Sequence, residues 1–413
     1  MKKLISPFIL VILVVFSCSQ KDEEFFNDEN LNKNKTAFSR EASELQNNTT
    51  IIENELVLQY VAEITEIQKE ELRLEYNVLS YEVCFCSNDI EIWTFEEVIQ
   101  AEHATASLKS SDDDDDDDDD GILVKHIDNQ FEFSSNYSSD GFQGASNINY
   151  LSNLVSVNQG VTIAVVDSGI DSNHPVFNQA QFLYNGNSSI MPSGWNFVNN
   201  DNNIYDYSGH GTQVSSIIHE ELYNNIFYNL LGVKVLNNDG NGRYSDVVCG
   251  TQYACENADI VTEAFGWHDD GSGNLKGDIL SSIFENHPNV LVVTSAGNNE
   301  NDNDILQHYP SSYTHENIIA VAASNTNSSD IASFSNYGGI SVDFYAKGEG
   351  ILFYDTELSG TSFSASYVAA RAAAVLYQSN MSYSPAELID YLDSNGTPAA
   401  NFSRATKYSK VIE

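Results

Sequence analysis

Four residues of the sequence have the side chains that acyl transfer needs, and they occur in the order Asp167, His210, Asn298 and Ser362. This reaction uses a nucleophilic hydroxyl, a base that takes its proton, a carboxylate that orients the base, and donors for the oxyanion. Each residue alone also has an ordinary structural explanation, because Asp is common in turns and Ser at helix N-caps. Together the four supply every group of the reaction.

Each of these residues lies where a predicted strand ends or a predicted helix begins. Asp167 and Asn298 each follow an apolar run that reads as a buried strand. His210 lies between two glycines, and Ser362 begins a helical pattern whose dipole and free N–H groups favour developing negative charge. Because crevices in open α/β sheets lie at the carboxyl ends of the strands, we expect the four residues to meet there.

From about residue 145, short apolar runs alternate with helical patterns, which predicts a parallel sheet covered by helices on both faces. Strands are expected at 161–167, 232–236, 259–265, 290–296 and 318–323, and helices at 211–222, 244–256, 278–286 and 362–377. A last helix should begin after Ser384, because Pro385 and Glu387 complete a capping box with proline at the first helical position.

The motifs resemble those of the subtilisin-like serine peptidases. The family signatures D-[ST]-G, H-G-T-H, a strand ending in G-N, and G-T-S-M-A-[ST]-P stand here as Asp167-Ser168-Gly169, His210-Gly211-Thr212-Gln213, Gly297-Asn298 and Gly360-Thr361-Ser362-Phe363-Ser364-Ala365-Ser366. The order Asp, His, Ser is that of subtilisin and not of chymotrypsin or the α/β-hydrolases. The resemblance covers roughly residues 150 to 413 and implies a three-layer αβα fold with a mostly parallel central sheet.

The resemblance implies a secreted serine endopeptidase that works through an acyl-enzyme. Ser362 would be the nucleophile, His210 the base, Asp167 its orienting carboxylate and Asn298 the oxyanion donor. The substrate would be a protein or peptide, held as an added strand between two segments. These segments are Gly240, Asn241 and Gly242 on one side and Ala264, Phe265 and Gly266 on the other.

Departures from the family pattern keep a second interpretation open, a catalytically inactive subtilase-fold lipoprotein that binds or scaffolds. Gln213, Ala264 and Ser366 replace family residues, and Trp267 replaces a small residue beside the pocket for the first substrate side chain. The chemistry requires no cofactor. A structural Ca²⁺ has no clear motif here, because the segment 224–231 is short compared with the family's calcium loop, so the metal assignment is left unknown.

The N-terminus reads as an export signal, with two lysines, an apolar run and the lipobox-like sequence Val15-Phe16-Ser17-Cys18. We expect lipid on Cys18, which anchors the chain to the membrane; the alternative is an ordinary signal peptide with an incidental cysteine. The expected location is the cell envelope or surface of a Gram-negative bacterium. The expected segments are a signal peptide at 1–17, a flexible tether at 18–54, an α+β domain at 55–110, an acidic linker and processing region at 111–145, and the peptidase domain at 146–413.

The domain at 55–110 resembles the inhibitory propeptide of many subtilases, which makes it an intramolecular partner of the peptidase. Its predicted elements are strands at 56–61, 78–86 and 90–95 and a helix at 66–76. Cleavage in the linker would leave the lipid on the propeptide and release the peptidase, unless the two pieces stay bound.

The net charge of −42 repels nucleic acid and anionic lipid head groups, which excludes them as partners. Nine consecutive aspartates, Asp112 to Asp120, suggest a third interpretation as a Ca²⁺-binding surface lipoprotein, but a flexible homopolymer holds no defined cage of oxygen ligands. Beyond Cys18 the cysteines form two pairs close in sequence, Cys84 with Cys86 and Cys249 with Cys255, and neither spacing favours a bond within the pair. No disulfide framework or zinc pattern follows from them.

Overall fold

The structure is a computed structural model that describes residues 49–85, 87–110, 123–135, 160–177, 180, 182, 194–354 and 356–413. All of these residues belong to one compact unit, 42–413. The predicted signal peptide, the lipidation site Cys18 and the aspartate run lie outside the described residues. Within the described part of the chain, no helix has both the length and the apolar character needed to cross a bilayer.

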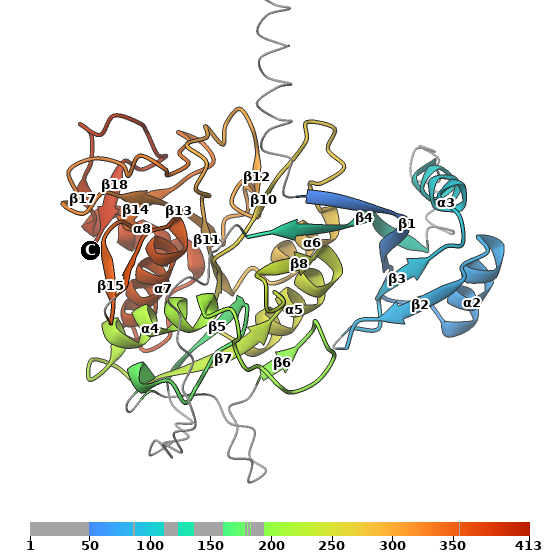
Figure 1. Cartoon of the computed structure of the whole chain (residues 1–413), viewed down its shortest axis with the longest axis horizontal. Helices are drawn as coiled ribbons and strands as arrows, with labels where there is room; N and C mark the ends of the chain where they lie inside the picture. Colours follow the sequence, from blue (N-terminus) through green and yellow to red (C-terminus); the bar gives the residue numbers. More distant parts are fainter. Residues whose placement is uncertain are drawn as a thin grey trace, which may run out of the picture. The chain divides into compact units, whose positions relative to one another are not determined.

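A nine-stranded, mostly parallel sheet forms the centre of the C-terminal part, with the strand order β17-β18-β14-β13-β11-β9-β5-β7-β6 (Figure 1). In that order the strands are Thr397–Pro398, Lys410–Ile412, Phe344–Lys347, Ile318–Ser324, Leu291–Ser295, Ile260–Glu263, Val161–Asp167, Tyr228–Lys234 and Gly194–Asn196. Only β17 runs antiparallel to its neighbour. Two-stranded sheets join β10 (Trp267–His268) to β12 (His308–Tyr309) and β15 (Ile351–Phe353) to β16 (Thr356–Leu358).

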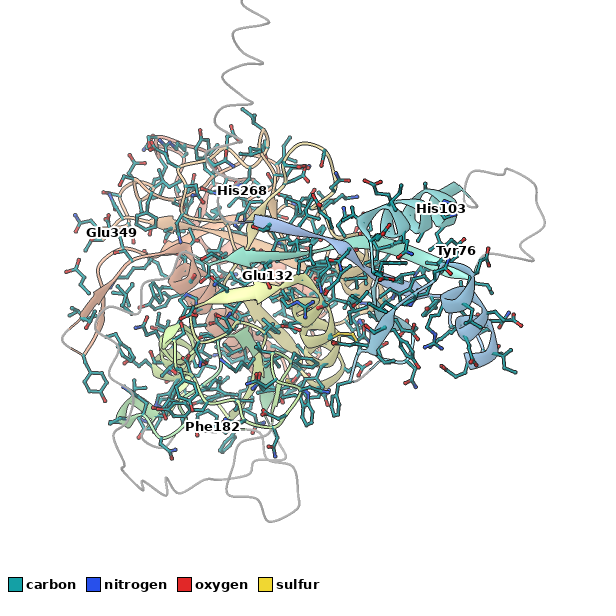
Figure 2. All side chains as sticks on the ribbon, turned by 45° about the vertical axis from the view of Figure 1, so that its right-hand side comes forward. Tyr76, His103, Glu132, Phe182, His268 and Glu349 are labelled. Atoms are coloured by element: carbon teal, nitrogen blue, oxygen red, sulfur yellow. A yellow bond between two sulfur atoms is a disulfide. The ribbon has the colours of Figure 1, made fainter. Side chains whose placement is uncertain are left out.

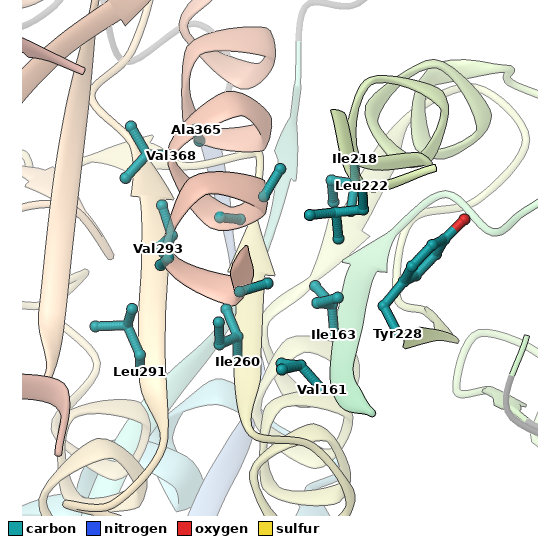
Figure 3. Close-up of a cluster of buried hydrophobic side chains, with 14 of the residues drawn as sticks. Val161, Ile163, Ile218, Leu222, Tyr228, Ile260, Leu291, Val293, Ala365 and Val368 are labelled. Atoms are coloured by element: carbon teal, nitrogen blue, oxygen red, sulfur yellow. The ribbon is translucent and has the colours of Figure 1, made fainter. Parts of the chain in front are cut away.

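Helices cover both faces of this sheet. On one face, α4 (His210–Leu222), α7 (Thr361–Gln378) and α8 (Pro385–Asn395) enclose one buried cluster, part of which is drawn in Figure 3. On the other face, α5 (Tyr244–Asn257) and α6 (Asp278–Asn286) enclose a second cluster. A short 3-10 helix, η2, spans Pro175–Phe177. The three-layer αβα architecture expected from the sequence is therefore confirmed.

Strand β5 shows why the buried strands read as continuous apolar runs. Val161, Ile163 and Val165 pack into the first cluster, whereas Ala164 and Val166 pack into the second. Both sets of side chains must be apolar because helices cover both faces. The capping box at Ser384 is present, with Glu387 N bonded to the Ser384 hydroxyl at 3.3 Å, and α8 begins where the sequence predicted it.

A five-stranded antiparallel sheet, with the order β2-β3-β1-β4-β8, contains most of the N-terminal part. The strands of this sheet are β1 (Thr49–Tyr60), β2 (Ser80–Val83), β3 (Ile90–Thr94), β4 (Val124–Ser134) and β8 (Asn241–Arg243). The helices of the N-terminal part are α2 (Glu66–Glu75) and α3 (Val98–Ser110). Two expected boundaries differ from this arrangement. Residues 49–54 belong to β1 rather than to a tether, and residues 124–134 form β4 rather than an extended linker, because β4 pairs along β1 and completes its sheet.

One disulfide joins the N-terminal part to the C-terminal part. Cys84 follows β2, Cys249 lies in α5, and their Cα atoms are 5.5 Å apart although 165 positions separate them in sequence. The expectation that the cysteines form no disulfide framework was wrong for this pair. Local spacing tests only near neighbours, whereas here the packing of two distant segments brings the sulfurs together. Cys255 is free and buried.

Candidate active site

The carboxylate and the imidazole predicted to work together are in contact. Asp167 ends β5 and is fully buried, and His210 is the first residue of α4. Nδ1 of His210 lies 2.9 Å from each carboxylate oxygen of Asp167. Because a carboxylate only accepts hydrogen bonds, Nδ1 carries the proton of the neutral ring, and Nε2 is left with a lone pair.

The first turn of α4 approaches β5 closely because residue 211 is glycine. A Cβ atom at Gly211 would lie 2.2 Å from the carbonyl oxygen of Gly169 and 3.2 Å from Oδ1 of Asp167. Any larger side chain would push the helix start, and His210 with it, away from the strand. The H-G dipeptide thus has a packing reason in addition to the chemistry of the histidine.

Asp206 supports the same loop and was missed by the sequence analysis. Its Oδ1 accepts hydrogen bonds from the Gly209 N–H at 2.7 Å and the Ser168 hydroxyl at 2.9 Å. Its Oδ2 accepts from the N–H and hydroxyl of Thr212 at 2.9 and 2.7 Å. The buried carboxylate therefore fixes the backbone on both sides of His210. Its position just before a Ser-Gly sequence and a helix start was the available signal, since Asp commonly accepts from N–H groups there.

Ser362 lies at the N-terminal end of α7, and its hydroxyl contacts the predicted substrate-binding segment Ala264–Gly266. Its Oγ donates to the carbonyl oxygen of Ala264 at 2.8 Å. Helices α4 and α7 pack in the same cluster, and the His210 ring lies 6.1 Å, centroid to centroid, from the ring of Phe363, the next residue after Ser362. The nucleophile candidate and the base candidate are thus on neighbouring helix starts.

The side-chain amide of Asn298 is held in one orientation. Its Oδ1 accepts from the N–H of Thr361 at 2.9 Å and from the hydroxyl of Thr361 at 3.0 Å. The hydroxyl of Thr361 in turn accepts from the N–H of Gly297 at 3.1 Å. Since the oxygen is engaged on the Thr361 side, the amide nitrogen keeps its two donors for another group beside Ser362.

Asn298 and Ser362 line one pocket together with the predicted wall Ala264, Phe265 and Gly266. The other residues around it are Thr49, Ser134, Ser135, Trp267, His268, Ser295, Gly297, Asn299, His308 and Thr361. The indole of Trp267, which the resemblance places beside the pocket for the first substrate side chain, packs against Phe131, Phe133 and Tyr244 and donates to the carbonyl of Leu275 at 2.7 Å.

The segment predicted to bind the substrate as an added strand, Gly240–Gly242, is paired with a segment of the same chain. Residues 132–134 of β4 run antiparallel to β8, and the N–H of Ser135 donates to the Gly240 carbonyl at 3.2 Å. A Cβ atom at Gly242 would lie 2.6 Å from the ring of Phe133, so glycine is needed for this approach. Figure 1 shows β4 and β8 side by side.

Among the described residues, no group of three or more His, Cys, Asp or Glu side chains is arranged to hold a metal ion. This observation does not test the expectation that the chemistry needs no cofactor. It also leaves the structural Ca²⁺ unassigned.

Residues 158–406, well over half of the chain, match the family model described as the subtilase family, Peptidase S8. The chain belongs to the subtilase family. The chain is 30% identical to thermitase of Thermoactinomyces vulgaris over 269 residues, which cover 61% of this chain and 88% of thermitase. It is 33% identical to alkaline serine exoprotease A of Vibrio alginolyticus over 238 residues, 55% of this chain. The chain spans only 40% of that relative's length.

The structural similarity to a solved protein extends beyond the residues that match the family model. The crystal structure of the epidermin leader peptide processing serine protease (EpiP) from Staphylococcus aureus superposes with a TM-score of 0.63 at 15% identity, covering 87% of this chain and 96% of that one. At this identity the likeness concerns the fold alone. Its coverage is larger than residues 158–406, so it includes part of the chain outside the family match.

Proposed function

We propose that this subtilase is a serine endopeptidase that cleaves peptide bonds with Ser362 as nucleophile. The observation that carries the proposal is the pairing of Asp167 with His210 at 2.9 Å, next to a pocket lined by both Ser362 and Asn298. An inactive binding protein is the less favoured function, because the chain retains all four of these residues.

In the proposed mechanism the Ser362 hydroxyl turns from the Ala264 carbonyl toward Nε2 of His210, which takes its proton as Oγ attacks the substrate carbonyl. Asp167 holds the imidazole in the correct tautomer and stabilises the imidazolium that forms. The Asn298 amide and the N–H of Ser362 donate to the oxyanion. His210 then protonates the leaving amine. In the second half of the reaction His210 takes a proton from water as the water attacks the acyl-enzyme, and it returns a proton to Oγ of Ser362 as the acid leaves.

Labelling with a fluorophosphonate, which reacts with an activated serine, would test this function. The purified protein should gain the mass of one adduct, located by peptide mapping on Ser362. An adduct on another serine, or none after the N-terminal part has been removed, would overturn the proposal and favour the binding function.

Replacing Asn298 by alanine should lower kcat by about 10²- to 10³-fold with little change in KM, because the lost donor acts only when charge develops on the oxygen. Steady-state kinetics on a fluorogenic peptide would measure both constants. Unchanged turnover would show that Asn298 is not the oxyanion donor.

The pH profile should report the state of His210. Burial lowers the pKa of His210, but the charge and hydrogen bond of Asp167 and the charge of Asp206 raise it more, so the pKa lies above its usual value of 6.5. Because the neutral ring is the base, kcat/KM should fall about tenfold per pH unit below a midpoint above 6.5. Asp206→Asn should move this midpoint to lower pH. A wild-type midpoint below 6.5 would contradict the assignment.

The N-terminal sheet is proposed to be the inhibitor of the same cleft. Support comes from β4, which pairs with β8 where the substrate would pair, and from Ser134 and Ser135, which line the pocket of Ser362. The proposed location is the cell envelope or cell surface of a Gram-negative bacterium, reached by the N-terminal signal and held by lipid on Cys18. Self-cleavage within 111–145 is proposed as the first step in freeing the cleft, before the Cys84–Cys249 bond is reduced and the N-terminal part leaves.

A further inference from the structure

Two buried imidazoles form part of the pocket beside Ser362. His268 in β10 and His308 in β12 pair directly across a two-stranded sheet, and their ring centroids are 5.0 Å apart. The side chain of His268, labelled in Figure 2, and that of His308 are 7% and 4% exposed. The described residues that line the pocket include no Asp, Glu, Lys or Arg. Its chemistry is therefore set by neutral polar groups.

The hydrogen bonds around His308 fit the tautomer that carries the proton on Nδ1. The hydroxyl of Ser311 donates its only proton to the carbonyl oxygen of His308 at 2.9 Å. The same hydroxyl lies 2.8 Å from Nδ1 of His308; with its proton on the carbonyl it accepts there, and we assign the ring proton to Nδ1. Nε2 is then an acceptor. No described residue bonds to it, and a Cβ atom at Gly266 would lie 2.6 Å from it, which places Nε2 at the pocket wall.

His308 keeps this neutral form at ordinary pH. Burial lowers the pKa of His308 well below its usual 6.5, and the neighbouring His268 lowers it further. Burial also lowers the pKa of His268, although Asn299 and the carbonyl of Gln307 raise it. A neutral His308 offers a lone pair to the pocket and no positive charge.

Asn299 supplies the complementary group at the rim of the pocket. Its Oδ1 lies 3.2 Å from Nε2 of His268 and, as a carbonyl oxygen, accepts from it. Its amide nitrogen keeps its donors, and the residue is exposed. An acceptor from His308 and a donor from Asn299 therefore border the same pocket.

Building on the proposed peptidase function, we infer that this pocket selects a carboxamide side chain, asparagine or glutamine, on the residue whose carbonyl Ser362 attacks. The substrate NH₂ group donates to Nε2 of His308 and its C=O accepts from the amide of Asn299. A carboxylate has no proton for Nε2, a leucine leaves Nε2 unpaired, and a lysine finds no counter-charge among the lining residues.

The chain itself suggests the probe for this inference. Its segment Glu132-Phe133-Ser134-Ser135 lies along β8, and the next residue in sequence is Asn136, which falls outside the described residues. We would use fluorogenic peptides Glu-Phe-Ser-Ser-X, with X as Asn, Gln, Asp, Leu or Lys, and the self-cleaved protein freed of its N-terminal part, as in the labelling experiment. The kcat/KM for Asn or Gln should exceed that for Asp, Leu and Lys by about tenfold or more, because an unpaired buried polar group disfavours the other side chains.

Variants separate recognition from catalysis. His308→Phe and Asn299→Leu should each lower the ratio of kcat/KM between the Asn and Leu peptides by about tenfold, while the Leu peptide is still cleaved. His315→Phe changes a histidine outside the pocket and should leave the ratio unchanged. Asn299 is exposed, so its variant remains informative if His308→Phe fails to fold.

The outcomes distinguish this inference from the function on which it rests. Fluorophosphonate labelling of Ser362 together with equal kcat/KM for the Asn and Leu peptides would overturn the inference alone. A preference that survives in both variants would also overturn it. A protein that neither labels nor cleaves any peptide after its N-terminal part has been removed would overturn the proposed peptidase function and the inference with it.

Discussion

Replacing Ser362 by alanine should lower peptide-bond turnover by about 10⁶-fold and abolish self-cleavage. The substitution removes only the hydroxyl, which donates a single hydrogen bond to the Ala264 carbonyl. The buried start of α7 is otherwise unchanged, so the fold should persist. Turnover of a fluorogenic peptide measures the first effect. Intact mass measures the second, since wild type should be shortened within residues 111–145 while the variant stays at full length.

A matched control for this experiment lies one position beyond Phe363 in the same helix. The hydroxyl of Ser364 is fully buried and donates to the carbonyl of Ala346 at 3.1 Å. Ser364→Ala should cost about 1 kcal/mol of folding stability but leave turnover and processing in place. If Ser362→Ala retained turnover comparable to Ser364→Ala, another residue would have to be the nucleophile.

Cleavage of the linker should leave the two parts of the chain covalently joined. The bond between Cys84 and Cys249 connects the segment after β2 to α5, on opposite sides of the proposed processing region. On a denaturing gel without reductant, processed wild type should therefore run as one species, and reduction should resolve it into two fragments. The expectation that the peptidase leaves a lipid-anchored propeptide then holds only after reduction.

Cys84→Ser should release the N-terminal fragment on the same gel without any reductant. Cys255→Ser is the matched control, because Cys255 is also buried in α5 but free, and this variant should behave as wild type. Two fragments from unreduced wild type, confirmed by mass, would contradict the prediction.

Noncovalent contacts support the same attachment in the folded protein. The Arg243 guanidinium lies 2.5 Å from the Glu55 carboxylate, and the Tyr244 hydroxyl donates to Asp128 at 2.7 Å. The amide of Gln130 donates to the Ser245 hydroxyl at 2.7 Å. Removing the disulfide alone should thus release the fragment fully only under denaturing conditions, while a native size-exclusion profile should change less.

Much of the C-terminal fold could be predicted because its strands are buried on both faces. The apolar run that ends at Asp167 became β5 with the predicted bounds, and helix α6 also matches its prediction. Strand β7 begins at Tyr228, earlier than the prediction of 232–236. The prediction started late because Asn229 interrupts the apolar run. The short strands β14 and β18 were not predicted, since three or four residues give too little periodicity to separate from a loop.

The sequence by itself determined the fold class, the family and the candidate residues Asp167, His210, Asn298 and Ser362. The apolar runs of buried strands and the short motifs that contain glycine are local properties of a chain, so they can be recognised without the structure. Only the tertiary structure decided how distant segments meet. It joined Cys84 to Cys249, set β4 against β8 and brought His308 into the pocket of Ser362. Such contacts depend on the packing of segments far apart in sequence, which no local pattern encodes.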